Sequence, residues 1–378
     1  EKFYKNLIEK TPFKAKLNYW YQTINYLRPF AIKNNIITDI NPFFMFNSYF
    51  KIAWRSLFKQ KLYSFINVTG MTIGMTCFIL LALYIQYELS YDKQHEKGDR
   101  IYRIAEDMEG YIFKGTSEFA CASIPVALST KTEIPEVESV TILRPASNLF
   151  KKDGEVISEQ GVYVDTSFFD IFSFPVIEGD PKSALKDKNT IILTAKMAKK
   201  FFGNNSPIGR EMEGRDKNRM TVKAVIEDVP DNHHFKFNYL TSIDNSSWYV
   251  NDKKKWSWSA SNYWAYVLLK EGADIQKIET AMEPFGEKAA AELVSLDYSI
   301  KPRWFLQPLT DIHLHSRMNY ELEANSDIRY LNLSASIAFI ILCLALINYM
   351  NLATARSSQR AKEVGMRKVL GANSGQLV

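Results

Sequence analysis

A long uncharged segment followed directly by a basic one constrains this chain more than any other feature. No Asp, Glu, Lys or Arg occurs between Arg329 and Arg356. The apolar middle of this stretch, 333–350, is long enough as a helix, at roughly 1.5 Å per residue, to cross a hydrocarbon layer of about 30 Å. The pattern predicts a transmembrane helix at 330–352.

A second uncharged segment, 62–87, lies nearer the N-terminus and predicts another transmembrane helix at 65–86. Gly70 and Gly74 have the small-xxx-small spacing that lets a second helix pack closely. Two incidental glycines are the alternative, because glycine is common in membrane helices. Neither span contains Asp, Glu, Lys, Arg or His, so these two helices offer no proton relay or ion site.

The segment after the second span, 353–378, is strongly basic. Against the single acid Glu363 it carries five basic residues, which are Arg356, Arg360, Lys362, Arg367 and Lys368. An excess of Lys and Arg beside a membrane span marks the cytoplasmic side. The segment reads as a helix that Gly371 is placed to cap. From the residues alone, a helix that only contacts lipid headgroups is equally open.

The segments before the first span are also basic. Residues 1–46 predict a cytoplasmic prefix region with one amphipathic helix, which starts at Thr11-Pro12 and ends before Pro29. Residues 47–64 place aromatic side chains opposite Lys and Arg, which is typical of a helix lying in the membrane interface. Basic flanks on both sides put the two ends in the cytoplasm and 88–329 outside it.

The outer region, 88–329, predicts a mixed α+β domain of two lobes, because short strands and helices alternate along it. The clearest local signal is a strand at 190–193, then Thr194 as helix N-cap, a helix at 195–202 and Gly203 at its end. Further strands are expected at 101–104, 140–143, 162–164, 221–229 and 263–269, and further helices at 124–132 and 274–293.

Composition excludes several classes of protein. The net charge of +5 comes from basic chain ends, and no basic stripe interleaved with aromatic residues points to nucleic acid. Three cysteines cannot form a disulfide framework, since Cys77 and Cys343 fall inside the spans and Cys121 is alone. We expect them to be packing residues. The chain, which begins at Glu1, is expected to be a fragment of a longer one.

The sequence predicts no catalytic, cofactor or metal site. His313 and His315 alternate on an expected strand, but no third ligand is found by spacing. His233 and His234 are expected to be solvated in a turn after Pro230. There is no Gly-x-Ser-x-Gly elbow. There is also no Gly-x-x-x-x-Gly-Lys-Ser/Thr loop, and the look-alike at 203–210 lacks the lysine.

Two sets of strings resemble one known family. The string at 360–372, Arg-Ala-Lys-Glu-Val-Gly-Met-Arg-Lys-Val-Leu-Gly-Ala, resembles the cytoplasmic signature after the second membrane helix in ABC transporter permeases of the MacB, LolC/LolE and FtsX type. Strings at 168–175, 178–181, 199–209 and 226–230 are similar to the extracytoplasmic domain of that family. The resemblance covers the chain from about Tyr49 to its end.

The resemblance implies a MacB-like periplasmic core domain with an inserted lobe near 150–225, followed by the start of an FtsX-like domain. It also implies that the basic segment docks on an ABC ATPase subunit, which binds the ATP. The residues expected at that contact are Glu363, Gly365, Arg367, Lys368, Gly371 and Ala372. Other expected partners are membrane lipid and a second permease copy or an internal duplicate, and the expected location is the inner (cytoplasmic) membrane.

The expected function is that of a permease subunit without enzymatic activity of its own. It would transmit ATP-driven motion of the ATPase to the outer domain, for export or extraction of a substrate that the sequence does not identify. The alternative is a two-span sensor or receptor with an outer ligand-binding domain, which shares the same topology. A membrane-anchored hydrolase is a third possibility, weakened by the missing nucleophile motif.

Overall fold

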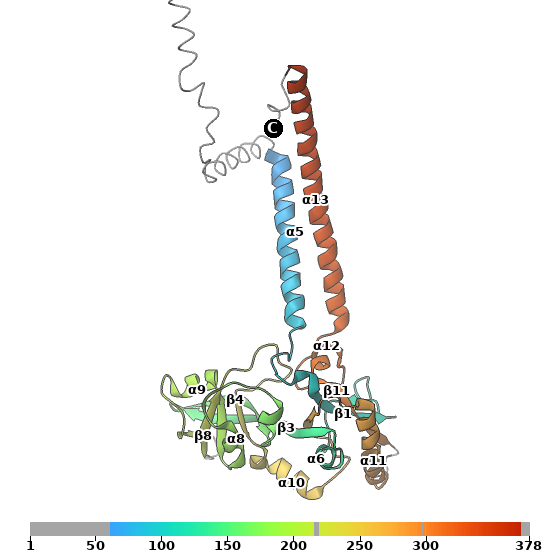
Figure 1. The fold of residues 1–378 in the computed structure, drawn as a ribbon. Coiled ribbons are helices and arrows are strands. Elements are labelled where there is room, and N and C mark those ends of the chain that lie inside the picture. Colours follow the sequence, from blue (N-terminus) through green and yellow to red (C-terminus); the bar gives the residue numbers. More distant parts are fainter. Residues whose placement is uncertain (1–60, 215–218, 297, 299, 372–378) are drawn as a thin grey trace, which may run out of the picture. The chain divides into compact units, whose positions relative to one another are not determined.

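The computed structural model describes residues 61–214, 219–296, 298 and 300–371 (Figure 1). The chain divides into two compact units. One comprises 74–344, and the described part of the other comprises 61–73 and 345–371. The predicted prefix region, 1–46, lies outside the described residues, as do 47–60 of the predicted interfacial helix.

The unit 74–344 is built on a single hydrogen-bonded sheet. Among the residues that the structure describes, its eleven strands follow the order β11-β1-β10-β3-β4-β9-β6-β8-β5, with β2 beside β1 and β7 beside β8. Their bounds are β1 Ile101–Glu109, β2 Glu118–Phe119, β3 Val137–Lys152, β4 Glu155–Val164, β5 Val176–Gly179, β6 Thr190–Thr194, β7 Glu211–Glu213, β8 Arg219–Ile226, β9 Tyr239–Ser242, β10 Trp264–Leu269 and β11 Lys301–Pro308.

Most neighbouring strands are antiparallel, but β4 pairs with β9, and β6 with β8, in parallel. Gly161 on β4 lies opposite Tyr239 on β9. A Cβ atom at position 161 would come within 2.3 Å of the Tyr239 ring, so only glycine lets that ring stay buried against the sheet.

Helices cover both faces of the sheet. The α-helices of the described residues are α5 Lys61–Glu88, α6 Ile124–Glu133, α7 Phe168–Ile171, α8 Pro181–Lys186, α9 Ala195–Phe202, α10 Ser247–Lys255, α11 Ile275–Val294, α12 Ile312–His315 and α13 Ile328–Val369. Of these, α5 and α13 continue into the other unit and contribute no side chain to the cores on the sheet. In Figure 1, α11 lies beside β1 and β11, while α8 and α9 lie at the other end of the sheet, near β8.

The cores follow from the alternation of side chains along the strands. Ile104 on β1 packs in a core with Ile278 and Phe285 of α11. Ile101, on the opposite face of β1, packs in a second core with Phe168 of α7. A third core lies between α9 and the strands β6 and β8. Both faces of the sheet are therefore buried over much of its width.

The strand and helix around Thr194 were predicted correctly. The Thr194 hydroxyl accepts a hydrogen bond from the backbone N of Met197 at 3.4 Å, and Gly203 ends α9 with a φ of 64°. Strand β11 was not predicted. The strands on either side of β4 belong to one continuous sheet, so the two predicted lobes share it. The limits proposed for the inserted lobe, 150–225, stay a prediction.

In the other unit, a polar contact joins α5 and α13. Asn348 donates from Nδ2 to the backbone oxygen of Asn67 at 2.9 Å. A Cβ atom added at Gly70 would lie 3.3 Å from the same Nδ2 atom. Gly70 therefore leaves the space that Asn348 occupies. The two apolar helices lack charged side chains and His, but this asparagine is a polar group of the kind that commonly joins membrane helices.

A buried ion pair ties the segment before α13 to strand β1. The Arg103 guanidinium is fully buried and donates to both carboxylate oxygens of Glu321, at 2.6 and 2.9 Å. It also donates to Gln307 Oε1 at 2.6 Å and to Ser316 Oγ at 3.1 Å. These contacts offset the cost of removing the guanidinium from water.

We predict that Arg103→Met lowers the free energy of unfolding by about 3 to 5 kcal/mol, because the substitution leaves the Glu321 carboxylate without its buried partner. Urea denaturation of the detergent-solubilised chain, followed by tryptophan fluorescence, measures the change. The matched control is Arg219→Met, which breaks an exposed pair with Glu211 and is expected to cost less than about 1 kcal/mol. Equal losses in the two variants would contradict the assignment.

The buried Glu106 on β1 makes the free energy of unfolding depend on pH. Its side chain is fully buried and both carboxylate oxygens lack a partner among the described residues. Burial raises the pKa of Glu106 to about 8, from the usual 4.5. The folded chain thus holds a proton that the unfolded chain loses, and between these two pKa values stability falls by about 1.4 kcal/mol per pH unit as the pH rises.

We expect Glu106→Gln to remove this dependence. The free energy of unfolding of the variant, minus that of the wild type, should increase as the pH rises from about 5 to 8 and then level off. Urea denaturation at a series of pH values tests this. A constant difference across the series would show that Glu106 does not carry the effect.

Candidate functional site

The candidate site is the region where the ends of the two apolar helices join the sheet, and all of its residues belong to the unit 74–344. Glu88, the last residue of α5, lies with its Oε2 atom 2.9 Å from Nε2 of His313 in α12. Both side chains are buried. The ring of Tyr91 stacks on the His313 ring, and the angle between the two ring planes is 1°. The end of α5 is thus joined to the segment that leads into α13.

The prediction for His313 and His315 was wrong. They lie in the short helix α12, not on a strand. His313 is buried against Glu88, whereas His315 is half exposed, with Nδ1 3.7 Å from Asp311 Oδ1. The run Ile-His-Leu-His has the alternation of a strand, but a run of four residues is too short to separate the two periods.

The prediction for His233 and His234 was also wrong. Both are buried, with 1% and 3% of their surface exposed. The rings of Phe172, Phe174 and Phe235 contact the His233 ring. The loop between β8 and β9 therefore holds its two histidines inside the domain, not in solvent.

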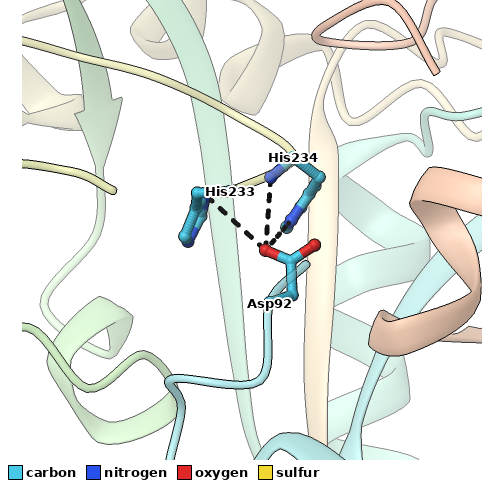
Figure 2. A group of neighbouring side chains, drawn as sticks. All are labelled: Asp92, His233 and His234. Atoms are coloured by element: carbon cyan, nitrogen blue, oxygen red, sulfur yellow. Dashed lines mark hydrogen bonds and ion pairs between the residues drawn. The ribbon is translucent and has the colours of Figure 1, made fainter. Parts of the chain in front are cut away.

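The backbone after α5 is fixed to this same loop. Asp92 has a left-handed φ of 58°, and its backbone N donates to the carbonyl oxygen of Asn232 at 3.0 Å. The Asn232 amide in turn donates to the backbone oxygen and hydroxyl of Ser90, at 3.1 and 2.8 Å. Asp92 is thereby placed under the two histidines (Figure 2).

Asp92 and His234 form the centre of a buried cluster. Oδ1 of Asp92 lies 2.8 Å from Nδ1 of His234 and also accepts from the His234 backbone N at 3.2 Å. The other ring nitrogen of His234 lies 2.8 Å from the Tyr266 hydroxyl. Burial alone would raise the pKa of Asp92, but the nearby His234 outweighs it and lowers that pKa. The carboxylate is therefore held in its charged form.

A chain of hydrogen bonds fixes the two other rings. The backbone N–H of Ser173 donates to Nδ1 of His95 at 3.1 Å, so a neutral His95 carries its proton on Nε2. That nitrogen lies 2.9 Å from Nε2 of His233. His233 then donates from Nδ1 to the Phe235 carbonyl oxygen at 2.8 Å. Burial lowers the pKa of His233 and lowers that of His95 to about 4, which keeps both rings neutral.

The cluster offers three metal-ligand atoms in a small volume. One atom each from Asp92, His233 and His234 lies within 4.8 Å of the others, and all three residues are buried. No sequence pattern predicts this group, because Asp92 and His234 are 142 positions apart. The prediction of no metal site considered only neighbours along the chain.

The residues predicted to contact an ATPase lie at the end of α13. Glu363, Gly365, Arg367 and Lys368 belong to that helix. Gly371 follows it with a φ of 90°, and Ala372 lies outside the described residues. Gly70 and Gly74 belong to α5. The ATPase contact stays a prediction.

The chain matches one family model over more than half of its length. The model is that of the MacB-like periplasmic core domain, and it matches residues 64–285. The match extends from α5 through strand β10 and into α11. None of the curated proteins compared with the chain matches it.

Solved structures resemble the same region. A domain of a protein assigned as a permease from Porphyromonas gingivalis is 21% identical, with a TM-score of 0.50, over 63% of this chain and 98% of that one. The periplasmic region of MacB from Actinobacillus actinomycetemcomitans is 15% identical, with a TM-score of 0.40, over 57% and 91% of the two chains. The extracellular domain of the ABC-type transporter YknZ from Gram-positive bacteria is 13% identical, with a TM-score of 0.38, over 54% and 99%.

The first of these structures has the same fold as the sheet domain. Together with the family match, it agrees with the resemblance found in the sequence. The chain belongs to the family of the MacB-like periplasmic core domain, that of MacB/FtsX-type ABC transporter permeases.

Proposed function

We propose that this chain is a permease subunit that transmits ATP-driven motion of a partner ATPase across the inner (cytoplasmic) membrane to its own sheet domain. The observation that carries the proposal is the buried contact between Glu88 and His313. It joins the end of one apolar helix to the segment that leads into the other. A displacement of either helix end would therefore move the sheet domain directly.

Membrane insertion is supported by the two helices themselves. Ser64–Glu88 and Ile328–Asn351 are each long and apolar enough to cross a bilayer. Large apolar side chains on both are exposed, among them Leu80 and Leu83 on α5 and Phe339 and Leu344 on α13. Lipid would cover these side chains. With basic flanks in the cytoplasm, the sheet domain lies on the outer side.

An ATPase partner is proposed for the cytoplasmic end of α13. Val369 and Leu370 are 88% and 82% exposed there, and a Cβ atom at Gly365 would meet nothing within 4 Å. An exposed apolar end beside Arg367 and Lys368 suits a protein partner with acidic groups. That partner would bind the ATP, and this chain would hold no nucleotide cofactor and have no enzymatic activity of its own.

Two further parts of the proposal concern assembly and cargo. The complex would contain either two permease copies or an internally duplicated permease, together with membrane lipid. The cargo would be exported or extracted by rearrangement of the outer domains. Membership of a permease family favours this function over a two-span receptor.

We predict that the double reversal Arg367→Glu, Lys368→Glu reduces the co-purifying ATPase at least about tenfold, because like charges would then face each other at the contact. Affinity purification of the full-length protein from its own membranes, with mass spectrometry of the co-purifying chains, measures the loss. The matched control is Lys254→Glu, Lys255→Glu, an exposed lysine pair on α10. Equal ATPase recovery from the two variants would exclude this contact site.

If ATP-driven motion passes through the contact between Glu88 and His313, replacing His313 should weaken the response of the sheet domain to ATP. In the complex with its ATPase, ATP is expected to change amide hydrogen exchange in residues 88–97 and 309–321. His313→Ala should reduce that change while the amount of bound ATPase stays the same, because the contacts with Glu88 and with the Tyr91 ring are lost far from the proposed ATPase contact. His315→Ala, which alters an exposed histidine two residues away, should leave the ATP response intact. An unchanged response in His313→Ala would refute the proposed link.

A further inference from the structure

The buried group of Asp92, His233 and His234 has the spacing of a metal site (Figure 2). Oδ1 of Asp92 lies 2.8 Å from Nδ1 of His234 and 3.7 Å from Nδ1 of His233. Ligand atoms around a tetrahedral zinc ion, with bonds near 2.0 to 2.1 Å, are roughly 3.3 Å apart. These two distances fall on either side of that value, and the ligand atoms of His233 and His234 lie within 4.8 Å of each other. The three ligand atoms would have to move closer together to hold an ion, while their residues already meet at one point.

The charge of the group also favours a cation. The Asp92 side chain is fully buried, and its Oδ2 atom has no hydrogen-bond partner among the described residues. Within the same part of the chain, the only basic side chains in ion-pair range of Asp92 are the two histidines. A buried carboxylate that neither Lys nor Arg balances is costly. A divalent ion would balance it and would engage the free oxygen.

The surroundings would hold the ligands in place. The ring nitrogen of His234 that faces away from Asp92 lies 2.8 Å from the Tyr266 hydroxyl. The corresponding nitrogen of His233 lies 2.9 Å from Nε2 of His95. Metal-binding histidines usually donate the hydrogen of this second nitrogen to a partner. The Tyr266 hydroxyl can accept it from His234. His95 can accept it from His233 once its own proton moves from Nε2 to Nδ1, which breaks the bond from Ser173. On binding, each ring would stay neutral and carry its proton on Nε2 in place of Nδ1, and the bond from His233 Nδ1 to the Phe235 oxygen would be lost.

We propose that Asp92, His233 and His234 bind one zinc-class divalent metal ion, which cross-links the segment after α5 to the loop between β8 and β9. Two imidazole nitrogens and one carboxylate suit zinc and its neighbours among the transition metals, whereas calcium and magnesium prefer oxygen ligands alone. The ion binds without ATP and without the ATPase partner. Binding can therefore be measured on the chain by itself.

The experiment uses the full chain in detergent without a polyhistidine tag, stripped with a chelator and equilibrated at micromolar free zinc. Bound zinc is measured by mass spectrometry after buffer exchange. We expect about one equivalent for the wild type and for His315→Ala, which removes an exposed histidine outside the group. His233→Ala and His234→Ala should each weaken zinc binding on the order of a hundredfold.

A second measurement needs no variant and so does not depend on whether the substituted chains fold. Cobalt titrated into the stripped wild type should give visible absorption bands of a four- or five-coordinate N/O site, which zinc should displace. Absence of bound zinc in the wild type, or an equivalent that survives both His233→Ala and His234→Ala, would overturn the proposal. In that outcome the group is a hydrogen-bonded cluster only, and the ATPase contact remains testable in its own right.

Discussion

Burial of carboxylates where the apolar helices meet the sheet domain constrains the rest of the structure. A carboxylate removed from water costs several kcal/mol unless a partner meets it with good geometry. Glu88 and Asp92 lie within four positions of each other, and each is met by a histidine from a distant segment. The end of α5 therefore cannot shift relative to these segments without exposing or unpairing a charge.

On the α13 side of the domain, a buried carboxylate is again paired with a side chain from a distant segment. Glu321 lies between α12 and α13, and Arg103 holds it against strand β1. Aromatic rings around His233 keep water out, which strengthens the electrostatic contacts nearby. Because both helix exits are held by buried polar contacts and not by flexible linkers, motion that reaches either exit would pass into the sheet as a rigid displacement.

Local signals in the sequence predicted much of the fold. The strand, cap, helix and glycine from 190 to 203 could be read directly, because each depends on neighbours a few positions away. Strand β11 was missed because prolines at positions 302 and 308 hide the alternation of its buried side chains. The histidine cluster could not be predicted, since the residues that meet there are far apart along the chain and lie in loops that the sheet brings together.

The proposed metal site and the proposed transmission of motion both depend on buried polar contacts where α5 and α13 leave the sheet domain. Helix α13 runs from Ile328 to Val369 without a proline, so nothing in its sequence forces a kink that would absorb a displacement. A helix passes a displacement into the domain only if its exit from the domain is firmly held. At the α13 side, the buried pair of Arg103 and Glu321 fixes the chain before the helix. At the α5 exit, the hydrogen bonds of Glu88 and Asp92 fix it, and metal bonds at Asp92 would strengthen that exit. The cross-link would then set how stiffly the α5 exit follows the loop between β8 and β9, without taking part in ATP binding.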